Sequence, residues 1–224
     1  PHVHEALASI HFPACSKDAE KAEERFAFEE LLILRLRALR ERALLKSRKA
    51  PAISCDVPLI KEFVRALPYT LTDAQRKSMW EIFSDLERPR PMNRLLEGDV
   101  GSGKTVVASS AILLAVRGGY RAALMAPTEI LARQHYETIA RTLAPFCIHV
   151  GLVVSSEKRA IESSDVLVGT HALLQKKVAV DNLGLIIVDE QHRFGVSQRA
   201  ALVHGSALMP HFLSMSATPI PRTL

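Results

Sequence analysis

The most informative segment of this chain is Gly98-Asp99-Val100-Gly101-Ser102-Gly103-Lys104-Thr105. It fits the phosphate-loop pattern G-x-x-x-x-G-K-[ST] at every fixed position. Such a loop turns tightly, and its glycines let successive backbone N–H groups point at a phosphate chain. We expect a short strand at 94–97 before the loop and an apolar helix over 105–116 after it, which is the context that such a loop requires.

Two side chains of this loop have the chemistry of a magnesium–nucleotide site. Lys104 would bring a positive charge to the β- and γ-phosphates of ATP. The hydroxyl of Thr105 would bind Mg²⁺. We therefore expect ATP and Mg²⁺ as cofactors, with the whole of 98–105 around the phosphates.

A second candidate site lies at the end of the apolar run 185–188, which is typical of a buried parallel strand. Asp189 and Glu190 follow directly, and open α/β sheets hold their ligands at the carboxyl ends of strands. Asp189 would bind the same Mg²⁺, directly or through water. Glu190 would orient and deprotonate an attacking water. The alternative is a charged turn that only ends a strand, and the phosphate loop upstream disfavours it.

A third candidate follows the apolar residues 211–213. Ser216, Ala217 and Thr218 would end another strand, where the two hydroxyls could bond the loop at 189–190 and report its state. Taken alone, Ser-Ala-Thr is most often only a turn.

The alternation of apolar segments from Asn93 onward predicts an α/β fold, a mostly parallel sheet covered by helices on both faces. The strands are expected near 93–97, 121–126, 147–153, 166–169, 184–189 and 211–215. Upstream we expect an irregular arm to residue 17, a long helix at 18–49 and a short helix at 59–67. The long helix carries an apolar stripe, and its basic residues form either a rail for DNA or a solvated face. The expected parts are thus a helical linker or arm at 1–67 and a nucleotide-binding lobe at 68–224.

Together, these segments resemble the motifs of superfamily 2 helicases. Residues 98–105 match motif I, 189–192 motif II and 216–218 motif III. Further similarity lies at Ala126–His135 (motif Ia), at Val168–Gln175 (the next DNA-contacting motif) and at Leu71–Gln75 (the Q motif). The resemblance implies a RecA-like P-loop lobe in which Gln75 reads adenine. Because Thr72 and Gln75 also fit a capping box, a purely structural role for Gln75 stays open.

Residues 190–196 and 216–223 are most similar to the RecG family of DNA helicases. Gln191 favours that family over the related transcription-repair coupling factors, which usually have glutamate there. The resemblance implies a motor that remodels branched DNA, such as stalled forks and Holliday junctions, by moving on duplex DNA. It also implies a wedge domain and a second RecA-like lobe, so we expect the isolated 224 residues to be nearly inactive. The chain starts at Pro1 and stops after motif III, as a piece of a longer protein would.

The resemblance also assigns roles to residues around the nucleotide. Coupling of hydrolysis to movement is expected from Gln191, His192, Ser216, Ala217 and Thr218. DNA contacts are expected from Pro127, Thr128, Glu129, Arg133, Gly169, Thr170 and His171. A plain helix cap is the alternative for Thr128. Residues 152–165 are shorter than in the family and lack its Thr-Gly-Ser turn, so DNA contacts from 155–159 are not expected.

The amino-acid composition limits the classes of binding partner that we expect. The net charge of +5 suits a nucleic acid, and the low aromatic content of 5% favours contacts with the DNA backbone over base stacking. The three cysteines show no zinc or disulfide spacing, and no apolar run reaches the roughly 18 residues of a membrane span. We expect a cytoplasmic monomer without a membrane partner. A small-molecule kinase, or a nucleotide-binding module without turnover in this form, are the alternatives.

Overall fold

The computed structural model describes residues 1–46, 48–174, 181–189 and 208–217. These residues form two compact units, which divide after residue 47. The sheet lies entirely in the second unit.

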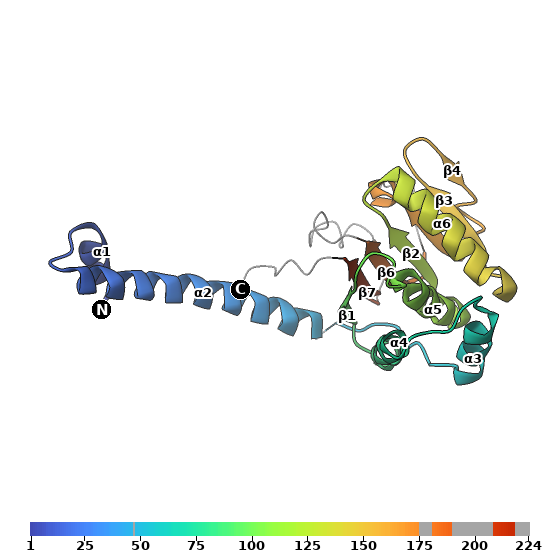
Figure 1. Cartoon of the computed structure of the whole chain (residues 1–224), viewed down its shortest axis with the longest axis horizontal. Coiled ribbons are helices and arrows are strands. Elements are labelled where there is room, and N and C mark those ends of the chain that lie inside the picture. The colour runs from blue at the N-terminus through green and yellow to red at the C-terminus, as the bar shows by residue number, and fades with distance from the viewer. Residues whose placement is uncertain (47, 175–180, 190–207, 218–224) are drawn as a thin grey trace. The chain divides into compact units, whose positions relative to one another are not determined.

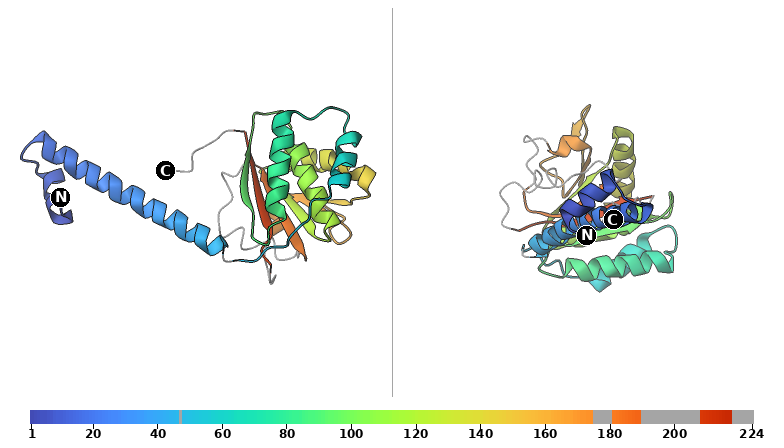
Figure 2. Two further views of the ribbon diagram at one scale, coloured as in Figure 1. Left: turned by 90° about the horizontal axis from the view of Figure 1, so that it is seen from below. Right: turned by 90° about the vertical axis from the view of Figure 1, so that its left-hand side faces the viewer.

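The first unit is a pair of helices, α1 (Val3–His11) and α2 (Ser16–Lys46). The expected irregular arm is therefore wrong: a capping box between His2 and Glu5 starts α1, with the His2 N–H donating to the Glu5 carboxylate at 3.0 Å. Ala6 and Ala22 are fully buried, and Figure 2 shows α1 folded back along the start of α2. Although α2 has 31 residues, none of the described helices is long and apolar enough to cross a membrane.

The second unit is built on a seven-stranded sheet of order β1-β7-β6-β2-β5-β3-β4 (Figure 1). Neighbouring strands pair in parallel, except β3 and β4, which are antiparallel. The strands are β1 (Asn93–Glu97), β2 (Arg121–Met125), β3 (Val150–Val153), β4 (Lys158–Arg159), β5 (Val166–Gly169), β6 (Leu183–Asp189) and β7 (His211–Ser216). The predicted α/β class and mostly parallel sheet are confirmed.

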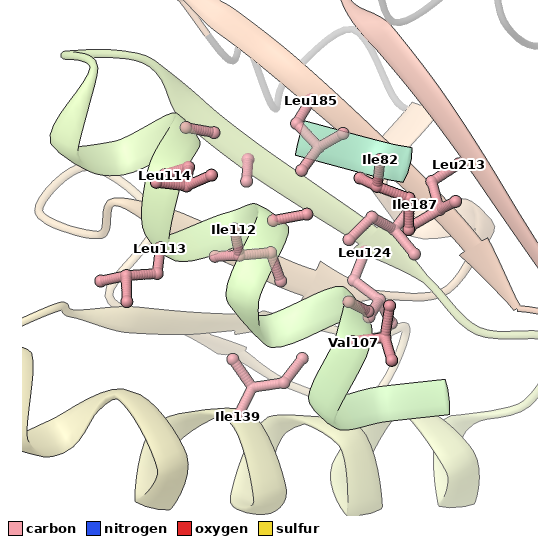
Figure 3. Close-up of a cluster of buried hydrophobic side chains, with 14 of the residues drawn as sticks. Ile82, Val107, Ile112, Leu113, Leu114, Leu124, Ile139, Leu185, Ile187 and Leu213 are labelled. Atoms are coloured by element: carbon pink, nitrogen blue, oxygen red, sulfur yellow. The ribbon is translucent and has the colours of Figure 1, made fainter. Parts of the chain in front are cut away.

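Four α-helices cover one face of this sheet, and a 3-10 helix packs on the other. The helical segments are α3 (Val57–Ala66), α4 (Asp73–Leu86), α5 (Lys104–Arg117), α6 (Glu129–Leu143), η1 (Ala144–Phe146) and η2 (His171–Leu174). Leu185 and Ile187 of β6 pack toward α5, as Figure 3 shows. Ile186 packs with Ala172 of η2 on the opposite face. Among the described residues, η2 and Ile161 pack on the second face, whereas α4, α5 and α6 lie side by side on the first (Figure 2).

The core explains where the second unit begins. The sequence placed the start of the lobe at residue 68, but the compact unit starts at Arg48. Ile53 and Phe63 are fully buried in the same core as α5. The Ile53 N–H also donates to the carbonyl of Leu86 at 2.9 Å. Residues 48–67 therefore pack with the lobe.

The start of the segment that is shorter than in the family forms a hairpin of β3 and β4. The backbones of Val154 and Glu157 exchange hydrogen bonds of 2.9 and 3.3 Å, which close a tight turn between β3 and β4. The register pairs Val153 with Lys158 and Leu152 with Arg159. Residues 161–163, between β4 and Asp165, form a further turn.

The parallel strands bring the described candidate segments that follow a strand to one edge of the sheet. The phosphate loop follows β1, the segment 126–128 follows β2, and Thr170 follows β5. Asp189 ends β6 and Ser216 ends β7, and these two strands lie next to each other. A ligand-binding site is thus expected at the carboxyl edge of the sheet.

Candidate active site at the carboxyl edge of the sheet

The phosphate loop runs between the end of β1 at Glu97 and the start of α5 at Lys104. Gly101 and Gly103 have φ angles of 82° and 81°, in the left-handed region that residues with a side chain rarely adopt. The first turn of α5 follows this loop directly, and a helix N-terminus leaves backbone N–H groups without a partner from a preceding turn. The N-terminus of α5 therefore offers an anion-binding site beside the loop.

The ammonium of Lys104 lies over the loop that precedes it. Its Nζ donates to the carbonyl oxygens of Gly98 at 2.5 Å and of Asp99 at 2.9 Å. Both acceptors are neutral, and a bond from the ammonium to an anionic phosphate oxygen is stronger. Lys104 can thus exchange these contacts for a phosphate chain without leaving the loop.

Gln75 connects the phosphate loop to helix α4. Its Oε1 accepts from the backbone N–H of Thr72 at 2.9 Å, and Thr72 Oγ1 accepts in return from the backbone N–H of Gln75 at 3.2 Å. Its Nε2 donates to the carbonyl oxygen of Ser102 at 2.9 Å. The capping box proposed for Gln75 is therefore present, and the same side chain also holds the loop.

The end of β7 lies against the start of the phosphate loop. The backbone N–H of Gly98 donates to the carbonyl oxygen of Ser216 at 3.2 Å, which extends the pairing of Glu97 with Ser216 by one residue. Ala217 follows directly, and Ser216 is buried. A shift of the end of β7 would thus displace the backbone of Gly98 at the start of the phosphate loop. Thr218, the last member of this predicted set, lies outside the described residues.

Asp189 is the last residue of β6, and its carboxylate is bound by a histidine from α6. Oδ2 of Asp189 lies 2.6 Å from Nε2 of His135, and the two side chains are only 14% and 12% exposed. The predicted neighbours Glu190, Gln191 and His192 lie outside the described residues.

The residues present fit a magnesium–nucleotide complex. The left-handed glycines shape a loop around a helix N-terminus, Lys104 supplies a cation, and Thr105 and Asp189 supply the hard oxygen donors that Mg²⁺ prefers. No cluster of three or more His, Cys, Asp or Glu that could hold a metal occurs in the described part of the chain. A phosphate-bound Mg²⁺ needs no such cluster, because it takes one or two protein ligands plus phosphate and water oxygens.

The segment after β2 caps and anchors α6. Thr128 is the N-cap, and its Oγ1 accepts from the backbone N–H of Leu131 at 3.3 Å, while Pro127 precedes it in the short segment between β2 and α6. Thr128 is exposed, so its hydroxyl is also open to a partner. The capping role stated as the alternative for Thr128 is present.

Glu129 and Arg133 hold the turn between β3 and β4. Glu129 accepts from the backbone N–H of Ser155 at 3.1 Å and from the hydroxyl of Ser156 at 2.7 Å, and the bond from Ser156 lowers the pKa of its carboxyl. Arg133 donates to Glu157 at 2.6 Å and to the hydroxyl of Ser156 at 3.3 Å. Arg133, and next Arg159, lower the pKa of Glu157. Two side chains predicted to contact DNA thus support a neighbouring turn.

The predicted residues after β5 lie at the start of η2. The carbonyl of Gly169 accepts from the N–H of Ala126 at 2.8 Å, and a Cβ on Gly169 would come within 2.1 Å of the carbonyl oxygen of Val153. Only glycine allows this close approach of β3 to β5. Thr170 caps η2, since its carbonyl accepts from the Leu173 N–H at 3.0 Å. His171 follows and is exposed.

Sequence reasoning missed two residues of this edge, His135 and Glu157. His135 is three residues after Ala132 and four before Ile139, both fully buried, so it belongs to the inward face of α6. That periodicity was the available signal for a buried polar group. Nothing in the local pattern marks Glu157 as the partner of Arg133.

Three comparisons place these observations among known proteins. The family model for DEAD/DEAH box helicases matches residues 72–224, more than half of the chain. Curated relatives include proteins named ATP-dependent DNA helicase RecG. That of Synechocystis sp. is 47% identical over 98% of this chain and 28% of its own length. That of Thermotoga maritima is 46% identical over 99% of this chain and 30% of its own length.

A solved structure described as RecG bound to a three-way DNA junction is also similar. It matches with a TM-score of 0.80 and 41% identity, over 97% of this chain and 30% of that one. The similarity to RecG read from the motifs is thereby confirmed, and with it the RecA-like fold. The chain spans only about 30% of the length of these relatives.

Proposed function

The chain belongs to the DEAD/DEAH box helicase family, and we propose that it is the ATP-binding motor lobe of a RecG-like DNA helicase. The whole protein would remodel branched DNA, such as stalled forks and Holliday junctions, and couple ATP hydrolysis to movement on duplex DNA. One observation carries the proposal: the phosphate loop, Asp189 and Ser216 meet at one edge of the sheet, and the Gly98 N–H bonds the Ser216 carbonyl directly. The relatives at more than 40% identity support the RecG type.

The residues of the phosphate loop and β6 would perform the chemistry. Lys104 would exchange its two carbonyl contacts for the β- and γ-phosphates of ATP. Thr105 and Asp189 would hold Mg²⁺, which neutralises charge that develops on the phosphates. Glu190 would take a proton from the attacking water. Gln75 would read adenine while its amide also anchors the loop at Ser102.

The same edge of the sheet would face DNA. Thr128 and His171 are exposed there, beside the N-termini of α6 and η2, where a hydroxyl and backbone N–H groups suit a phosphate. Pro127, Glu129, Arg133, Gly169 and Thr170 would shape this surface. Gln191, His192, Ser216, Ala217 and Thr218 would couple hydrolysis to movement. A wedge domain, a second RecA-like lobe, a monomeric state and a cytoplasmic location complete the proposal.

ATP hydrolysis by the full-length protein, with and without forked DNA, tests this function. We expect DNA to stimulate hydrolysis, and the Glu190→Gln variant to bind nucleotide but lose turnover. Lys104→Ala should weaken nucleotide binding at least about tenfold, because a charge-assisted bond contributes about 1.5–3 kcal/mol. Hydrolysis that ignores DNA, or full activity of Glu190→Gln, would contradict the proposal.

A further inference from the structure

We infer that His135 is a positioning residue of the metal site, which holds the carboxylate of Asp189 in place for Mg²⁺. The inference rests on the proposed function, because it takes Asp189 as a magnesium ligand. His135 comes from α6, whereas the phosphate loop and Asp189 come from the ends of β1 and β6. It therefore adds a group from another element to the site.

The position of His135 on α6 directs its ring toward the sheet. Ala132 and Ile139, three residues before and four after it, are fully buried on the inward face of the helix. The neighbouring Tyr136 packs against the core as well. With 12% of its side chain exposed, the ring of His135 has few orientations that avoid its neighbours. The 2.6 Å contact with Asp189 thus joins two side chains that are both largely buried.

The chemistry of the contact defines which group donates. A carboxylate only accepts hydrogen bonds, so Nε2 of His135 is the donor and Oδ2 of Asp189 the acceptor. A carboxylate with one oxygen anchored loses much of its freedom to rotate about χ2. The orientation of Asp189 is then set before a metal binds, and less conformational entropy is lost on binding. Hydrogen bonds of this kind to carboxylate ligands typically contribute 10- to 100-fold in metal affinity.

The same contact connects the metal site to the proposed DNA-facing surface. His135 stands seven residues after the N-cap Thr128, about two turns along one continuous helix. Glu129 and Arg133 bind the β3–β4 turn from the same end of α6. A displacement of this end of α6 would therefore move the donor of the bond to Asp189.

Two substitutions separate the hydrogen bond from the packing. His135→Phe keeps a ring of similar shape and removes the donor, whereas His135→Gln keeps an amide donor near the position of Nε2. His149→Ala is the matched control, because His149 also faces an aspartate, Asp165 at 3.6 Å, but is 77% exposed. The full-length protein is titrated with Mg²⁺ in the presence of ADP carrying a fluorescent label, and binding of the nucleotide is followed.

We expect His135→Phe to raise the Mg²⁺ concentration for half-maximal nucleotide binding by 10- to 100-fold. His135→Gln should stay within about threefold of the parent, as His149→Ala should, and all variants should bind the labelled ADP equally in excess chelator. An unchanged Mg²⁺ requirement in His135→Phe would overturn the inference, as would a His135→Gln variant no better than His135→Phe. A parent protein whose nucleotide binding ignores Mg²⁺ would instead overturn the proposed magnesium site itself.

Discussion

The side-chain amide of Gln75 fastens the phosphate loop to helix α4, because its Nε2 donates to the carbonyl oxygen of Ser102 at 2.9 Å. Its Oε1 is held at the same time by the backbone N–H of Thr72. The loop approaches so closely that a Cβ on Gly103 would lie 2.3 Å from Nε2. The helix cap and the nucleotide site, which the sequence presented as alternatives for Gln75, therefore share one side chain.

Two substitutions should separate these roles. Gln75→Glu keeps the acceptor for Thr72 but replaces the donor to Ser102 with an anionic oxygen. We therefore expect nucleotide affinity to fall about 2- to 10-fold, which corresponds to the contribution of one hydrogen bond. Thr72→Ala removes the hydroxyl of the capping box and should lower stability by about 0.5–2 kcal/mol. Its nucleotide affinity should stay near that of the parent. Calorimetric titration with ADP and Mg²⁺ measures the nucleotide affinity of both variants, and urea unfolding measures the stability of Thr72→Ala. Equal nucleotide affinity for Gln75→Glu and the parent would refute a role of Gln75 in holding the phosphate loop.

The ion pair between Arg133 and Glu157 makes a second prediction. Because Glu157 engages the guanidinium, Glu157→Gln should release Arg133 toward a DNA phosphate in the full-length protein. We expect tighter binding to forked DNA. The slope of the logarithm of the binding constant against the logarithm of the salt concentration should become steeper by up to about one unit, the value for one added phosphate contact. Arg133→Gln should remove that gain when combined with Glu157→Gln.

Fluorescence titrations at several salt concentrations measure both the affinity and its salt slope. Glu162→Gln serves as the control, because it removes one acidic charge from the same segment of the chain. If Glu162→Gln steepens the salt dependence as much as Glu157→Gln does, net charge explains the effect and Arg133 makes no DNA contact.

The strands could be predicted because a parallel sheet is buried on both faces. Such strands read as short continuous apolar runs, and 185–188 and 211–213 both lie within observed strands. The rule that parallel strands share a carboxyl edge then placed the phosphate loop, Asp189 and Ser216 together. The hydrogen bond from Gly98 to the Ser216 carbonyl is the direct result of that pairing.

The remaining contacts could not be predicted, because they depend on distances between side chains from separate elements. Glu129 and Arg133 are typical of a DNA-contacting motif, yet their partners Ser156 and Glu157 lie in the turn of a hairpin that no signal in the sequence indicated. His135 was visible as a polar residue on an apolar helix face. Its contact with Asp189 joins α6 to the end of β6, and no pattern in the sequence near either residue indicates this pair.

The 224-residue chain by itself should bind nucleotide but hydrolyse it slowly. Lys104, Thr105 and Asp189 all lie on this lobe, whereas the charge that develops on the γ-phosphate is proposed to be stabilised by an arginine of a second lobe. Such an arginine contributes about 10³–10⁵ in turnover. Steady-state hydrolysis with saturating forked DNA measures the difference from the full-length protein. Comparable turnover of the two would show that the second lobe is not required.

His211 joins β7 to two segments that precede the phosphate loop. Its Nδ1 accepts from the backbone N–H of Met92 at 3.1 Å, and its Nε2 donates to the carbonyl of Pro51 at 2.6 Å. The ring is fully buried, and burial lowers the pKa of the imidazole below its usual value of 6.5. Protonation would remove the acceptor for Met92 and leave a charge in the core.

The stability of the chain should therefore decrease as the solution is acidified. Since the folded pKa of His211 lies below the unfolded value, its neutral form contributes stability that is fully present above about pH 6.5 and is lost as the pH falls through the lowered folded pKa. His211→Leu should be less stable at pH 7.5 by about 1–3 kcal/mol, because the backbone groups of Met92 and Pro51 lose their partner. The deficit should shrink on acidification to pH 5.5, since leucine cannot be protonated. Urea unfolding of both proteins at the two pH values measures this difference in the free energy of unfolding. His149→Leu, at an exposed histidine, is the control. A difference that stays constant or grows on acidification would exclude His211 as the titrating group.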